Sequence, residues 1–121
     1  MTTDLANLSP AELDAVAAVE VMGWLDDGDL WHYVDETSLC QLSKSCWCPT
    51  ESIADAFTLV AKMRERGLRF WLMPHDTVTA EFEWFPDDGE GVCREYSAIA
   101  ETFPLAITRA AVLAVSGMAG K

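Results

Sequence analysis

The chain has 121 residues, of which 50% are hydrophobic, and its 20 acidic residues against 8 basic ones give a net charge of −12. This length and apolar content predict one globular domain that needs no disulfide or metal to form its core, and they exclude a disordered chain. The negative charge repels nucleic acid and anionic membranes, so we expect neither as a partner.

The beginning of the chain lacks the basic and apolar segments of a signal peptide, and no apolar run is long enough to span a bilayer. We therefore expect a cytoplasmic protein, in which the four cysteines are reduced thiols or metal ligands. Residues 1–121 are predicted to be a single domain with flexible tails at 1–8 and 117–121.

The first predicted helix starts at Ser9 and Pro10, with Glu12 completing a capping box. It is expected to run to about Trp24, and residues 26–29 are expected to end it with turn chemistry. Residues 30–49 are predicted to be largely irregular, with two short strand candidates at 30–34 and 39–42.

A second helix is predicted after residue 50, with Thr50 as its N-cap and Gly67 as its stop. The hydrophobic period then changes from 3.6 to 2, which predicts strands at 68–73 and 78–84, and a third at 92–97. Short links favour an antiparallel sheet. The predicted class is α+β, with a sheet of about three strands sandwiched by helices, in the order helix, irregular segment, helix, three strands, helix.

The last predicted helix, over residues 103–115, carries one charge, Arg109. A helix so apolar must be covered by a sheet, a neighbouring helix or a second subunit. The last of these options leads us to expect a homo-oligomer. Arg109 then needs a carboxylate partner, an exposed edge or an anionic ligand, because a buried guanidinium is costly without one.

Several side chains are candidates for ligand binding. Half of the basic residues lie in one cluster, at Lys62, Arg64, Arg66 and Arg69, which predicts either an anion site or favourable charge near a helix C-terminus. Aromatic residues near basic ones suit stacking or a protein interface, and the alternative is core packing. The candidate ligand-binding residues are Arg109, Arg69, Arg66, Trp71 and Trp47.

A second group of candidates contains metal-binding and nucleophilic residues. His32, Cys40, Cys46 and Cys48 contain the donor set of a zinc site, but Cys-x-Cys is an unusual zinc spacing, and small buried hydrophobes explain the cysteines as well. Cys46 or Cys48 could pair with His32 or His75 as a thiol nucleophile, and Cys48 precedes a helix, which would lower the pKa of its thiol. We expect no catalytic residues and no cofactor, with zinc as the alternative. The acidic loop containing Asp87, Asp88 and Glu90 is expected to be solvated.

Three segments resemble the phage ABA-sandwich domain family: Val21-Met22-Gly23-Trp24, residues 49–57 and residues 102–111. The resemblance spans most of the chain in the right order, and residues 25–49 depart from it. It implies a small phage or prophage protein with a sheet sandwiched between helices, located in the host cytoplasm, and it implies no known enzyme activity.

The expected function is therefore that of a non-enzymatic accessory protein that binds, and thereby inhibits or sequesters, a host factor. A second hypothesis is an oligomeric sponge for a small anionic, nucleotide-like ligand. A zinc- or thiol-dependent enzyme and a structural protein of particle assembly are further alternatives. The sequence names neither the partner nor the number of subunits.

Overall fold

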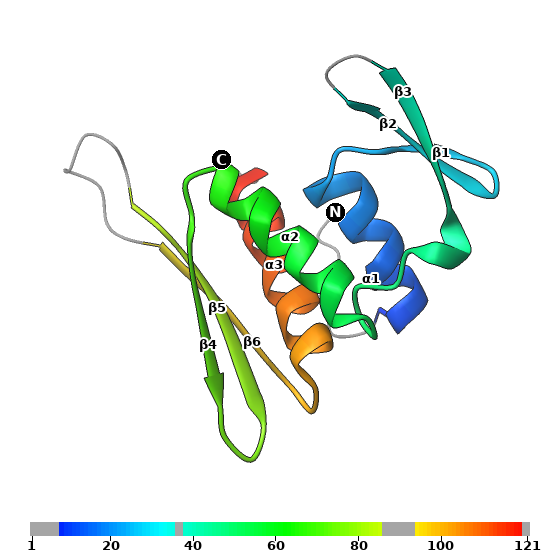
Figure 1. Cartoon of the computed structure of the whole chain (residues 1–121). Helices are drawn as coiled ribbons and strands as arrows, with labels where there is room; N and C mark the ends of the chain where they lie inside the picture. The colour runs from blue at the N-terminus through cyan, green and yellow to red at the C-terminus, as the bar shows by residue number, and fades with distance from the viewer. Residues whose placement is uncertain (1–7, 36–37, 86–93, 120–121) are drawn as a thin grey trace.

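The structure, a computed structural model, describes residues 8–35, 38–85 and 94–119. Its helices lie between two antiparallel sheets of three strands each (Figure 1). The elements are α1 (Pro10–Val16), the π-helical turn η2 (Ala17–Val21), β1 (Leu25–Asp27), β2 (Leu30–Asp35), β3 (Ser38–Ser43), the 3₁₀ turn η3 (Lys44–Cys46), α2 (Ile53–Glu65), β4 (Arg69–Pro74), β5 (Val78–Trp84), β6 (Arg94–Ala100) and α3 (Phe103–Ala119).

The α+β class is confirmed, and the order of helices and strands broadly matches the prediction. One sheet between helices was predicted, whereas the structure has two sheets with the helices between them (Figure 1), because residues 25–43 form a sheet of their own. The predicted third strand is present as β6, and the two strand candidates in the segment expected to be irregular are β2 and β3. The predicted acidic loop at Asp87, Asp88 and Glu90, and Cys93, lie outside the described residues. Residues 1–7 and 120–121 of the predicted tails also lie outside the described residues. The rest of the predicted C-terminal tail, up to Ala119, belongs to α3.

The first helix begins as predicted, with the reciprocal hydrogen bonds of a capping box between Ser9 and Glu12. It ends earlier than predicted, because Gly23 takes a left-handed φ of 75°. The turn residues expected to end it instead join β1 to β2. There Gly28, with φ 65°, opens a two-residue hairpin turn after Asp27, the use for which glycine is favoured.

The second helix is capped by Ser52 and not by Thr50 as predicted. The Ser52 hydroxyl oxygen accepts a hydrogen bond from the backbone N–H of Asp55 at 3.2 Å. Thr50 is buried, and it donates both its N–H and its hydroxyl to the carboxylate of Asp14 on α1, at 2.9 Å and 3.2 Å. A partner 36 positions away has therefore replaced the local capping bond. Gly67, with φ 93°, is the stop after α2, as predicted.

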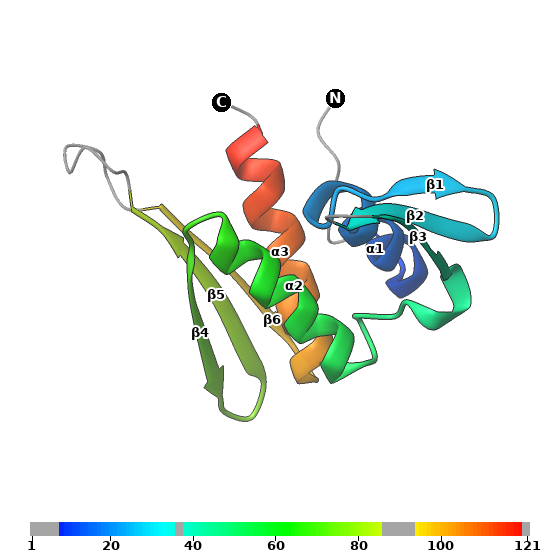
Figure 2. The ribbon, with the colours of Figure 1, turned by 45° about the horizontal axis from the view of Figure 1, so that its top comes forward.

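The second sheet, in the order β4-β5-β6, is covered on one side by α2 and α3 (Figure 2). Phe82 is fully buried on that inner side, and Phe70 packs against it with ring centroids 5.1 Å apart. None of the described helices lies on the opposite side, which we call the outer face. The strand alternation predicted from the sequence is thus confirmed for β4 and β5.

The apolar α3 lies at the centre of the molecule. It contacts β5, β6, α2, α1 and η2, and Ala106, Ile107 and Ala110 have no exposed surface. The chain's own sheet and helices therefore cover most of α3, which removes the need for a second subunit to do so. None of the described helices combines the length and apolarity that a membrane crossing requires.

Candidate binding face of the second sheet

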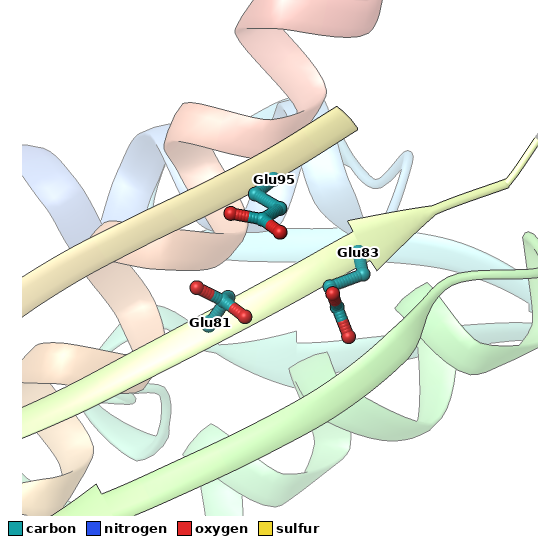
Figure 3. Close-up of side chains that lie close together, drawn as sticks. All are labelled: Glu81, Glu83 and Glu95. Atoms are coloured by element: carbon teal, nitrogen blue, oxygen red, sulfur yellow. The ribbon is translucent and has the colours of Figure 1, made fainter. Parts of the chain in front are cut away.

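Three glutamates gather on the outer face. Glu81 and Glu83 come from β5 and Glu95 from β6, and one carboxylate oxygen of each lies within 4.8 Å of the others (Figure 3). Antiparallel pairing explains the cluster, because Glu83 is directly opposite Glu95 and Glu81 lies two residues along the same strand face. Within the described residues, no other group of three or more His, Cys, Asp or Glu side chains comes this close.

The cluster is electrostatically unfavourable for the free protein. Partial burial raises the pKa of Glu81 above its ordinary value of 4.5, and the neighbouring carboxylates of Glu95 and Glu83 raise it further. Like charges opposite one another destabilise a sheet. The fold therefore tolerates a concentration of negative charge that a cationic partner would relieve.

Apolar side chains lie beside these carboxylates on the outer face. Trp71 is 52% exposed and Ile99 is 60% exposed, and Met73 is exposed as well. Trp71 is opposite Glu81 in the strand register, and its indole N–H donates a hydrogen bond to the Glu83 carboxylate. A large aromatic surface thus adjoins an acidic one, on a side of the sheet that no described helix covers.

Replacing Glu81 with glutamine is expected to stabilise the protein by about 0.5 kcal/mol at pH 7, because it removes one of the like charges. In a chain of this size, such a gain corresponds to a rise of roughly 2 °C in the melting temperature. The indole bond to Glu83 stays intact in this variant. Thermal unfolding of the wild type, Glu81→Gln and the exposed control Glu20→Gln would measure the effect.

The gain should depend on pH in a defined direction. Because the folded-state pKa of Glu81 is raised, its ionisation costs stability as the pH rises from 4.5 through that pKa, and the loss remains at higher pH. The advantage of Glu81→Gln should therefore be largest at pH 7, shrink as the pH falls through that raised pKa, and be lost below 4.5. An advantage of the same size at both pH values would contradict this account.

The structure disperses the candidate ligand-binding residues. Arg109 donates to the backbone carbonyl of Ile99 at 3.1 Å. Arg66 donates to the backbone carbonyls at the end of η2, at 2.9 Å for Val21 and 3.4 Å for Glu20. Each of these two guanidiniums thus joins a helix to a neighbouring segment through backbone carbonyls.

Trp47 is 5% exposed, and its indole N–H donates to the backbone carbonyl of Asp14 at 2.9 Å, so it packs in the core. Arg69 and Trp71, in contrast, line one shallow depression of about 510 Å³ together with Arg64. There the Arg69 guanidinium lies 4.7 Å from the centre of the Phe85 ring. The structure therefore brings only Arg69 and Trp71 of the five candidates together.

The metal and thiol candidates lie around the first sheet and the turn that follows it. The Nε2 atom of His32 on β2 is 2.7 Å from the Asp27 carboxylate. Cys40 on β3 is paired with Tyr33, one position out of register with His32. Cys46 is exposed in η3, and Cys48 is half-buried.

The expectation of a lowered Cys48 pKa is wrong. Burial raises the pKa of this thiol, and the nearby carboxylates of Asp55, Asp14 and Glu51 raise it further. The backbone N–H of Cys48 also donates to Asp55 at 3.0 Å, so the segment before α2 is surrounded by acidic groups. Burial and these charges both disfavour the thiolate, and Cys48 lies four residues before Ser52, the N-cap of α2, so the helix N-terminus does not offset them.

The two-residue period predicted for residues 78–84 implies that Glu81 and Glu83 share one strand face, but Glu95 was not predicted as the third member of the cluster. The available signal was the alternation of exposed positions Glu95, Ser97 and Ile99 along β6. This alternation was not recognised, because the strand was predicted at residues 92–97 whereas β6 spans Arg94–Ala100.

The fold and the outer face together define a small α+β protein with an acidic and aromatic surface on the side of its second sheet that no described helix covers (Figure 2). The chain belongs to the phage ABA sandwich domain family, which it matches over residues 15–112. It is also similar to a phage protein from Bacillus cereus ATCC 14579, known from a crystal structure, with 16% sequence identity and a TM-score of 0.64. That similarity covers 93% of this chain and 96% of the other. No curated protein matches this chain.

Proposed function

We propose that this phage-family protein acts by binding and not by catalysis, and that its outer face binds a cationic segment of a host protein. Occupying that segment would inhibit or sequester the host factor, as a counter-defence protein does. The observation that carries the proposal is the exposed Trp71 beside the three clustered carboxylates. Tryptophan is among the residues that contribute most to protein interfaces.

The chemistry of the outer face favours arginine or lysine side chains as the partner's contacts. Carboxylates accept charge-assisted hydrogen bonds from guanidinium groups, and an indole ring attracts a cation over its face. A cation placed between Glu81, Glu83 and Glu95 would also relieve the repulsion that raises the Glu81 pKa. The overall charge of −12 would increase the association rate with a basic partner.

The test uses an oligoarginine peptide as the probe in calorimetric titrations at low and physiological salt. The triple variant Glu81→Gln/Glu83→Gln/Glu95→Gln is expected to weaken binding by about a hundredfold or more, since each of the three lost charge-assisted bonds contributes about 1 kcal/mol or more. Trp71→Ala is expected to weaken it as well.

The matched control is Glu20→Gln/Glu51→Gln/Glu101→Gln, which changes the net charge equally, from −12 to −9, at exposed positions away from the cluster. It should retain most of the affinity. Equal weakening by the two triple variants would mean that net charge alone attracts the peptide, and it would refute a site on the outer face.

A sponge for a small anionic ligand is the second candidate function. The depression that contains Arg64, Arg69 and Trp71 supports it, because guanidinium groups and an indole suit a nucleotide-like anion. Glu83 beside Trp71 opposes it, since its carboxylate would repel such a ligand. Native mass spectrometry of freshly purified protein would show both the oligomeric state and any retained anion.

A further inference from the structure

A second surface, separate from the outer face, is hollowed between α2 and the first sheet. This groove has a volume of about 680 Å³, within the range of small-molecule sites. Its walls come from segments far apart in the sequence, including Met22, Trp24, Tyr33, Ala61 and Lys62. The sequence placed Trp24 only near the end of the first predicted helix and Lys62 only in a basic cluster.

One wall of the groove is a rigid aromatic surface. The rings of Trp24 and Tyr33 stack, with centroids 5.3 Å apart and planes inclined by 27°. Behind them, Trp47 packs edge-on against Trp24 at 4.6 Å, and Trp47 is itself fixed by its bond to the Asp14 carbonyl. A surface held in place before binding loses little conformational entropy when a flat ring stacks on it.

The opposite wall offers one positive charge. Lys62 is half-buried on α2, and within the described residues its ammonium has no ion-pair or hydrogen-bond partner. A partly buried ammonium next to apolar walls is costly without a counter-charge, so an anionic group on a ligand would satisfy it.

The other charges around the groove limit the ligand to one negative group. Glu65 lines the same groove one turn along α2, and the His32 imidazole on the β2 side is already next to the Asp27 carboxylate. A multiply charged anion such as a nucleoside triphosphate would meet these carboxylates, whereas a single carboxylate can contact Lys62 and avoid them.

We propose that this groove binds a small planar aromatic molecule with one anionic group. The ring stacks on Trp24 and Tyr33, and the anionic group is paired with the Lys62 ammonium. The site differs in place and in ligand class from the cationic partner assigned to the outer face.

The probe is indole-3-acetate, compared with its neutral analogue indole-3-acetamide, in titrations of the full chain followed by two-dimensional NMR. The carboxylate is expected to shift the side-chain indole signal of Trp24 and to bind about tenfold more tightly than the amide, as one charge-assisted contact implies. Lys62→Met should remove this difference between the two compounds. The control Arg64→Met, with the same charge loss on the same helix, should preserve it.

A second variant tests the place of binding without altering the aromatic wall. Ala61→Trp adds a large side chain from an exposed position of α2 into the groove and should abolish binding of both compounds, while the melting temperature stays within a few degrees. The proposal is overturned if carboxylate and amide bind equally to the wild type, if neither binds, or if Lys62→Met and Arg64→Met behave alike.

Discussion

Replacing Asp14 with alanine is expected to lower the free energy of unfolding by about 3 kcal/mol. The Asp14 carboxylate accepts the N–H and the hydroxyl of Thr50, and Thr50 is only 4% exposed, so water cannot replace both bonds. A buried donor left without an acceptor costs about 1–3 kcal/mol. The effect should be large because Asp14 joins α1 to the turn that precedes α2.

Urea unfolding with Glu51→Ala as the control would measure this loss. Glu51 is exposed beside the same turn and carries the same charge, yet its removal should change stability by less than about 0.5 kcal/mol. Asp14→Asn retains an acceptor for the Thr50 N–H and should fall between the two. A loss in Asp14→Ala no greater than in Glu51→Ala would show that Thr50 does not depend on this carboxylate.

The stability that Asp14 contributes is expected to decrease as the pH rises, because its carboxylate is partly buried. Desolvation raises the pKa of its carboxyl, although the two hydrogen bonds from Thr50 lower it in part. The group therefore contributes less stability above its folded-state pKa than below 3.8. Asn cannot ionise, so the stabilities of Asp14→Asn and the wild type should differ least at acidic pH, where the Asp14 side chain is neutral as well.

Replacing Gly117 with alanine is expected to destabilise the protein by about 1–2 kcal/mol, although alanine is the better helix former. A Cβ atom at this position would lie 2.5 Å from Cε1 of Tyr96 and 3.3 Å from its Cδ1. Tyr96 is partly buried on β6 and packs against the core, so its ring has little room to move away. The clash should exceed the gain of about 1 kcal/mol in helix propensity.

A double-mutant cycle isolates this contact. In a Tyr96→Ala background the clash is absent, and Gly117→Ala should then stabilise α3 by up to about 1 kcal/mol. Ser116→Ala, at an exposed position of the same helix, should be neutral or slightly stabilising in either background. The clash would be ruled out by a Gly117→Ala effect of the same sign with and without the Tyr96 ring.

The alternation of residues along a strand predicts part of the outer face, but not all of it. Alternation along residues 78–84 was enough to put Glu81 and Glu83 on one side of a sheet. The pattern could not show that Glu95 would complete the cluster, since that depends on the register between β5 and β6. The exposure of Trp71 likewise follows from the position of the helices, which lie only on the inner side among the described residues.

The sequence by itself determined the features whose partners lie within about four residues. The capping box of Ser9 and Glu12, the helix stop at Gly67 and the two-residue period of β5 depend on neighbouring backbone groups, so short patterns encode them. The resemblance that identified the family also rests on such segments, because helix caps and core faces recur in order along the chain.

Only the tertiary structure decided which distant groups meet. Thr50 is of a residue type that caps helices, but its N–H and hydroxyl both donate to the carboxylate of Asp14. Ser52 is the N-cap of α2 instead. Arg109 donates to the backbone carbonyl of Ile99 in an exposed hydrogen bond, a partner that the sequence did not indicate. The physical reason is that a side chain's best partner is fixed by packing over the whole chain, where one buried hydrogen bond can outweigh a local preference of similar size.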